Sequence, residues 1–139
     1  MNYLGVDYGT KRIGLAYGNE LGVAVPLSPA VQKKKEERMA HIAGIIEEKD
    51  ISTLVIGLPC HLNGDLGEKA KEVDVFAREL GKRFNLPVCL MDESLSTYVA
   101  LEGTKKLGLK DASRSGVLDS RAAAVILQDF LDRQVLEES

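Results

Sequence analysis

The sequence predicts an α/β protein in which one mixed β-sheet carries helices on both faces. The chain opens with apolar segments separated by short turns that contain glycine or proline, a pattern typical of antiparallel strands. Further along, short apolar segments alternate with amphipathic helical patterns, which is typical of parallel strands with helical crossovers. The length of 139 residues suits a single domain spanning residues 1–139, and a hydrophobic fraction of 45% is enough for an ordinary core.

The first part of the chain predicts an antiparallel meander. Residues 2–8 and 12–18 have the composition of strands, and a short glycine turn joins them. Residues 23–27 predict a third strand. We expect Pro26 and Pro29 to end this strand, because proline has no backbone N–H to donate to a neighbour.

The second part predicts helices and buried strands in alternation. Helical periodicity covers about residues 33–49 and 68–84, and a final helix covers residues 117–131. Two short apolar runs, at residues 54–57 and 87–91, predict strands that are buried on both faces. The apolar positions expected to face inward on the first two helices are Met39, Ile42, Ile45, Ile46, Val73, Phe76, Ala77 and Leu80.

Two polar stretches and one further helix complete the predicted order. Residues 58–67 are rich in glycine, proline and asparagine and predict a mobile loop. Ser94 is placed to cap a helix that ends near Leu107, because its hydroxyl can accept from the open amides of the first turn. Residues 108–115 predict a polar loop before the last helix.

Charge and composition exclude several classes of protein. The formal net charge of −3 argues against a protein that coats nucleic acid without specificity. The chain has no run of about 18 apolar residues and no basic segment leading into an apolar one at its start, so we expect a cytoplasmic protein with no membrane partner. Cys60 and Cys89 form no CxxC motif, which leaves a structural zinc site unsupported.

Three acidic residues stand where a carboxylate is of more use for chemistry than for packing. Asp7 ends the first strand and Glu93 follows the last one, so both belong to the carboxyl edge of the sheet, where α/β proteins bind ligands. Asp119 begins the inward face of the final helix, and a carboxylate on such a face needs a partner. The rest of that face consists of Ala122, Ala123, Ile126 and Phe130.

Each acid also has a purely structural interpretation. Asp7 can bond the amides of the turn before Gly9, as aspartates in turns often do. Glu93 can be a residue of a helix first turn that the helix dipole favours. Asp119 can be an N-cap if the helix starts at Ser120.

If the three acids meet, their charges recruit a cation. Two like charges about 4 Å apart repel by about 4 kcal/mol at an effective dielectric constant near 20, so three carboxylates either protonate or bind metal. Oxygen ligands select hard ions such as Mg²⁺ or Mn²⁺. A pair of such ions stabilises the attacking and leaving oxygens of a phosphodiester, so the predicted chemistry is metal-dependent hydrolysis of a nucleic-acid backbone.

Four motifs, in order across nearly the whole chain, resemble those of the YqgF family of RuvC-like nucleases. They are GVDYGTKRIGLA at 5–16, Gly57-Leu58-Pro59 with Gly64 and Gly67, DESLST at 92–97 and DSRAAAVILQ at 119–128. The resemblance implies an RNase H-like fold. It also implies a nuclease that processes the 5′ end of precursor 16S ribosomal RNA, or one that resolves Holliday junctions in branched DNA.

The resemblance assigns roles to individual residues as well. By position, Asp7, Glu93 and Asp119 would be both catalytic and metal-binding, and they would hold Mg²⁺ or Mn²⁺, with two ions expected. The residues implied in substrate binding are Thr10, Lys11 and Arg12.

Two positions depart from the family pattern. Ser94 stands where an arginine is usual, which removes an expected phosphate contact. Cys60-His61 replaces a segment that often carries asparagine, which removes the asparagine contacts to substrate expected from this loop. The three acids are retained, so neither departure predicts an inactive protein.

Two further classes of function compete with the nuclease. An actin-like nucleotide-binding protein is one, because Asp7-Tyr8-Gly9-Thr10 fits the Asp-x-Gly-Thr pattern of its phosphate loop, although such proteins close two domains over the nucleotide. A noncatalytic nucleic-acid-binding module is the other, but carboxylates repel phosphate unless a metal intervenes. The sequence leaves both a monomer and a homodimer open.

Overall fold

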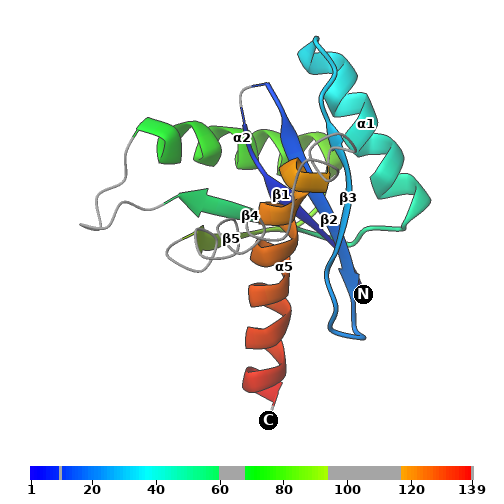
Figure 1. The fold of residues 1–139 in the computed structure, drawn as a ribbon, viewed down its shortest axis with the longest axis vertical. Coiled ribbons are helices and arrows are strands. Elements are labelled where there is room, and N and C mark those ends of the chain that lie inside the picture. The colour runs from blue at the N-terminus through cyan, green and yellow to red at the C-terminus, as the bar shows by residue number, and fades with distance from the viewer. Residues whose placement is uncertain (10, 60–67, 94–116, 139) are drawn as a thin grey trace.

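The computed structural model describes residues 1–9, 11–59, 68–93 and 117–138, and it contains five strands in one sheet (Figure 1). The strand order is β3-β2-β1-β4-β5, and the helices among the described residues, α1, α2 and α5, pack around the strands. The elements are β1 (Asn2–Asp7), β2 (Ile13–Asn19), β3 (Val25–Ala30), α1 (Lys35–Glu48), β4 (Thr53–Pro59), α2 (Glu68–Phe84), β5 (Val88–Glu93) and α5 (Val117–Glu138).

The sheet is mixed in the predicted way. Strands β1 and β2 pair antiparallel, with Asp7 opposite Gly14, and β2 pairs antiparallel with β3. Strand β4 pairs parallel with β1 on one side and with β5 on the other. Because β1, β4 and β5 run in the same direction, their carboxyl ends lie at one edge of the sheet.

Helices cover the two faces of the sheet unequally. One core combines Leu4, Val6 and neighbouring strand residues with α1 and α2, where Met39 and Phe76 are buried. The other core combines strand residues such as Ala16 with α5, which crosses the opposite face (Figure 1). The prediction of helices on both faces is confirmed. Among the described helices, none is both long and apolar enough to cross a membrane.

The predicted helix at residues 68–84 matches α2, and its four expected inward positions are all buried. The prediction that prolines end the third strand is wrong, because Pro26 and Pro29 both lie inside β3. Pro26 is paired opposite Ala16, and β3 lies at the edge of the described sheet. An edge strand tolerates proline because one side of it needs no ladder hydrogen bond.

The prediction that residues 87–91 form a strand buried on both faces is wrong in its burial. Strand β5 ends the described sheet, and Leu90 keeps 42% of its surface exposed while Met91 is buried. The final helix runs seven residues further than predicted, to Glu138. The predicted loop over residues 58–67 begins too early, because Leu58 and Pro59 belong to β4. The rest of that loop, the helix that Ser94 would cap and the polar loop at 108–115 lie outside the described residues.

Candidate functional site

Asp7 lies at the tip of the central strand, at the carboxyl edge of the sheet. It is the last residue of β1 and is half-buried. The backbone turns sharply just after it. The turn is so tight that a Cβ atom on Gly9 would clash with the carbonyl oxygen of Arg12. A side chain larger than hydrogen does not fit at this turn. The glycine therefore keeps the backbone beside Asp7 tightly folded.

The direction of the Asp7 side chain follows from strand alternation. Leu4 and Val6 belong to the core under α1 and α2, whereas Tyr3 belongs to the core under α5. Successive side chains of a strand point to opposite faces, so Asp7 is on the α5 side. Its cross-strand partner Gly14 has no side chain, which leaves room on this face of the sheet.

Helix α5 runs antiparallel to β1, with its start at the same edge as Asp7. Its middle part packs directly on Gly5, where an added Cβ would come within 2.8 Å of Leu127 Cβ and 2.9 Å of the Ala123 carbonyl oxygen. Towards the other end of β1, the hydroxyl of Tyr3 lies 3.1 Å from Gln134 Oε1. Two residues of strand and four residues of helix both cover roughly 6 Å, so the turn before Ala123 lies level with Asp7.

Ser120 fastens this first turn of α5 to the sheet. Its hydroxyl accepts a hydrogen bond from the backbone N–H of Leu15 at 3.2 Å and donates one to the carbonyl oxygen of Leu27. The register between β2 and β3 shifts between Ile13 and Leu15, and the completely buried serine bridges the two strands next to this shift. Backbone groups that would lack partners are thereby satisfied.

The sequence analysis did not identify Ser120 as a site residue. The available signal was a small polar residue at the head of an apolar helix face, which is also typical of an ordinary N-cap. Its backbone partners Leu15 and Leu27 are 105 and 93 residues away in the sequence. No local pattern could have supplied them.

The backbones of the other two predicted acids belong to the same edge. Glu93 is the last residue of β5 and pairs opposite Pro59, the last residue of β4. Asp119 is the third residue of α5, so the interpretation of Asp119 as an N-cap is wrong, because the helix begins two residues earlier at Val117. Among the side chains that the structure describes, which exclude those of Glu93 and Asp119, no three potential metal ligands cluster.

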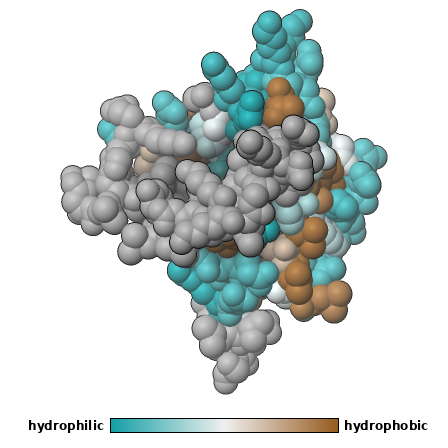
Figure 2. Space-filling model, viewed as in Figure 1, coloured by the Kyte–Doolittle hydropathy of each residue, from teal (hydrophilic) through white to brown (hydrophobic). Residues whose placement is uncertain are grey.

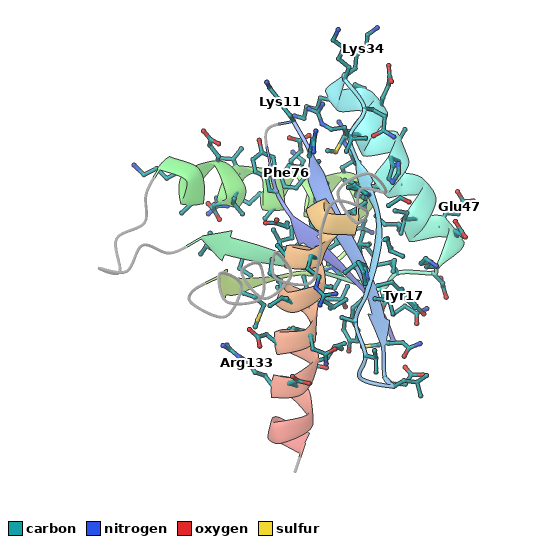
Figure 3. All side chains as sticks on the ribbon, in the orientation of Figure 1. Lys11, Tyr17, Lys34, Glu47, Phe76 and Arg133 are labelled. Carbon is teal, nitrogen blue, oxygen red and sulfur yellow. The ribbon has the colours of Figure 1, made fainter. Side chains whose placement is uncertain are left out.

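The predicted substrate-binding residues lie in the turn after β1. Lys11 and Arg12 are both exposed, and Lys11 points away from the body of the molecule at the tip of the β1–β2 hairpin (Figure 3). Thr10 lies outside the described residues, as do Cys60, His61 and Ser94. The two cations stand four and five positions after Asp7.

Known proteins resemble this chain along nearly its whole length. A family model described as "RuvX: Holliday junction resolvase" matches residues 1–133. A protein of Opitutus terrae named "Putative pre-16S rRNA nuclease" is 42% identical over 135 residues, covering 96% of this chain and 93% of the relative. A protein of Methylobacillus flagellatus with the same name is 45% identical over 130 residues, covering 93% of this chain and 89% of the relative.

Solved structures share the fold. Thermus thermophilus RuvC in complex with a Holliday junction substrate superposes with a TM-score of 0.57 at 20% identity, covering 97% of this chain and 96% of the other. Fowlpox virus resolvase bound to Holliday junction DNA gives a TM-score of 0.50 at 12% identity, covering 94% and 99% of the two chains. The fold is therefore RNase H-like, as in the RuvC-type resolvases. The chain belongs to the RuvX family, also called YqgF, which its four motifs resemble.

Proposed function

We propose that this protein is a metal-dependent nuclease that hydrolyses phosphodiester bonds and processes the 5′ end of precursor 16S ribosomal RNA. The observation that carries the proposal is the position of Asp7, a half-buried carboxylate at the tip of β1, on the face where Ser120 anchors the start of α5. The names of the Opitutus and Methylobacillus relatives support the RNA substrate. Such a substrate would place the protein in the cytoplasm.

Asp7, Glu93 and Asp119 are the proposed catalytic and metal-binding residues. The donor set fits hard ions, because it contains only carboxylate oxygens, and all three backbones belong to one edge of the sheet. Bound Mg²⁺ or Mn²⁺, with two ions expected, would supply electrostatic stabilisation to the oxygens of the phosphodiester. Position 93 is two residues after the buried Met91 on the same strand, so the two positions belong to the same face of the sheet. Met91 packs on the α5 side, which is also the side of Asp7.

Lys11 and Arg12 are proposed to bind the phosphates that flank the cleaved bond, with Thr10 supporting the turn. Both cations are exposed and follow Asp7 directly along the hairpin. In a chain with a net charge of −3, cations beside the carboxylates give the substrate backbone a local attraction that the protein as a whole does not provide.

A second candidate function is the resolution of Holliday junctions. The description of the matching family and the fold shared with Thermus thermophilus RuvC favour it. A resolvase cuts two strands symmetrically, and a homodimer is the usual solution to that geometry. The two candidates use the same carboxylates and differ in the nucleic acid that the surrounding surface accepts.

The test offers both substrates to the same protein. Precursor 16S RNA fragments and a four-way DNA junction are incubated in parallel with Mg²⁺, with Mn²⁺ and with EDTA. We expect metal-dependent cleavage of the RNA, and a loss of at least about 10³-fold in Asp7→Asn, because one ligand and one charge are removed from the reacting centre. Asp50→Asn is the matched control, since Asp50 is exposed and its positive φ of 51° suits asparagine equally well.

Each outcome has a distinct meaning. Cleavage of the junction in preference to the RNA would select the second candidate, and a dimeric mass in solution would agree with it. Undiminished cleavage by Asp7→Asn would reject the carboxylate centre. RNA binding without cleavage in either metal, unchanged in Asp7→Asn, would indicate a noncatalytic binding module. Tight binding of ATP in calorimetry would point to the actin-like alternative.

A further inference from the structure

A pocket of about 390 Å³ opens on the other side of the strand tip that carries Asp7. Its inner wall is formed by residues of the β1–β2 hairpin, and its other walls come from the first half of α1 and from α2. The volume lies within the range of roughly 300–1,000 Å³ that is usual for small-molecule sites. The lining includes Tyr8, Gly9, Lys35, Arg38, Lys71 and Phe76.

The pocket combines an aromatic wall with a charged rim. The rings of Tyr8 and Phe76 are in contact, with centroids 4.4 Å apart and planes tilted by 41°. Phe76 is buried, whereas the ring of Tyr8 is only partly covered. Val75 adds apolar surface with 66% of its area exposed. Aromatic surface that is partly open to solvent can stack on the face of a nucleic-acid base.

The rim carries a net positive charge. Lys35, Arg38 and Lys71 line the pocket together with Glu72 and Glu79, so three cations face two carboxylates. The Arg38 guanidinium donates to two carbonyl oxygens, of Gln32 at 2.8 Å and of Lys33 at 3.1 Å, and within the described part of the chain no carboxylate is paired with it. Its charge therefore stays available to an anion.

Ion pairs connect the two helical walls of the pocket. Lys35 Nζ on α1 lies 2.9 Å from Glu79 Oε1 on α2. Arg83 on α2 donates two hydrogen bonds of 3.2 Å to the carboxylate of Glu36 on α1. These bonds favour the charged form of the Glu36 carboxylate and lower its pKa. The walls are joined before any ligand arrives.

The pocket and the carboxylate edge share one short segment of backbone. Asp7 is on the α5 side of the sheet, and the next residue, Tyr8, packs against α2 on the opposite side. Figure 3 shows Lys11 and Lys34 projecting at the same end of the molecule, with Phe76 below them, and Figure 2 shows that this end is largely hydrophilic. A nucleic-acid strand that passed over Gly9 from the carboxylate edge to the pocket would meet these cations.

We propose that this pocket holds an unpaired nucleotide of the substrate strand, adjacent to the bond that is cut, with its base against Tyr8 and its phosphate against Lys71 and Arg38. The inference rests on the proposed nuclease function and specifies its substrate as a single-stranded segment. A base inside a duplex has both faces covered by its neighbours, so it cannot offer a face to Tyr8.

The test measures binding in EDTA, which removes metal-dependent cleavage and leaves the pocket intact. The probe is a fluorescein-labelled 12-nucleotide oligouridylate RNA, titrated at several salt concentrations. We expect Lys71→Glu to weaken binding by about tenfold at low salt. The slope of log K against log[salt] should become shallower by about 0.7 or more, because a phosphate contact is lost. Lys82→Glu is the matched control, since it makes the same charge change three turns along α2, outside the pocket.

The aromatic wall is tested by a second pair of variants. Tyr8→Leu should weaken binding at least about fivefold, whereas Tyr8→Phe, which keeps the ring, should bind like the parent protein. Thermal unfolding of each variant verifies that the fold is retained. A blunt 12-base-pair RNA duplex should bind more weakly and respond equally to Lys71→Glu and Lys82→Glu.

The results separate this inference from the function on which it rests. Equal effects of Lys71→Glu and Lys82→Glu on the single strand would overturn the pocket, and so would a parent protein that does not bind the oligouridylate. A loss on the duplex as large as on the single strand would overturn the unpaired nucleotide. The nuclease itself is judged by the cleavage assay with Asp7→Asn, which requires no binding data.

Discussion

The two faces of the sheet are built in different ways. Under α1 and α2 the strands present large aliphatic side chains, such as Leu4, Ile13 and Ile56, all with 1% or less of their surface exposed. Under α5 the strands present glycines at the points of closest approach, Gly5 and Gly18, beside larger residues such as Tyr3. The helix backbone therefore comes close to the sheet on one face and is held further away by side chains on the other.

The two kinds of packing differ in how rigidly they hold a helix against the sheet. Bulky side chains fill volume, and similar volumes can be achieved with several combinations of residues. Backbone packed on backbone allows little displacement, and the hydroxyl of Ser120 adds a directional link between α5 and two strands. Asp7 lies on the face that α5 covers, where the helix backbone is close to the sheet. The proposed centre is therefore on the more rigidly defined side of the sheet.

The largest expected effect on stability comes from shortening a buried side chain on the face that α1 and α2 cover. Leu4→Ala should lower the free energy of unfolding by about 2–5 kcal/mol, because Leu4 is completely buried and its loss leaves a cavity. Urea denaturation measures this change. Leu21→Ala is the control, because Leu21 is 83% exposed and should change stability by less than about 0.5 kcal/mol. Equal, small effects would mean that α1 and α2 close over a loosely packed core.

Adding a single methyl group under α5 should lower the free energy of unfolding. Gly5→Ala should destabilise the protein by about 1–3 kcal/mol, since the Ala123 carbonyl, a backbone atom, can move only with the helix. Gly44→Ala, within α1, places its new methyl group more than 4 Å from every described atom beyond the backbone of its own helix, and should stabilise by up to about 1 kcal/mol. The opposite signs are measured by the same denaturation curves, and a neutral Gly5→Ala would contradict the close packing of α5.

The smallest expected change in stability, with a separate effect on activity, comes from Ser120→Ala. It leaves the Leu15 N–H and the Leu27 carbonyl without their partner and should cost about 1–2 kcal/mol. Because Ser120 adjoins Asp119, kcat for RNA cleavage should fall by about tenfold or more with little change in KM. The serine acts by positioning the helix start.

Ser52 supplies the matched control for that variant. Its hydroxyl also bridges two backbone groups, since it accepts from the N–H of Asn2 at 3.2 Å and donates to the carbonyl oxygen of Asn2 at 3.0 Å. This bridge lies at the amino end of β1, away from the carboxyl edge. Ser52→Ala should lower stability less than Ser120→Ala does, because Ser52 is only half-buried and the Asn2 carbonyl still accepts the Ser52 backbone N–H at 2.9 Å. It should leave kcat unchanged. If both variants reduced kcat equally, Ser120 would be only a structural residue.

Local patterns were sufficient for the elements whose burial is periodic. The apolar stripe of α2 gave both its bounds and its buried residues, because a helix on a sheet must turn one face inward. The same reasoning failed at the edges of the sheet. Pro26 lies within β3, and Leu90 is exposed on β5, since both strands border the described sheet and follow rules that differ from those of a central strand.

The sequence by itself determined the fold class, the strand that ends in Asp7 and the family, because these depend on residue types at short spacing. Only the tertiary structure decided that Ser120 joins α5 to β2 and β3, that Gly5 admits the helix, and that a pocket opens behind Tyr8. The physical reason is separation along the chain. Contacts between residues about a hundred positions apart depend on how whole elements pack, and a local sequence pattern does not predict that packing.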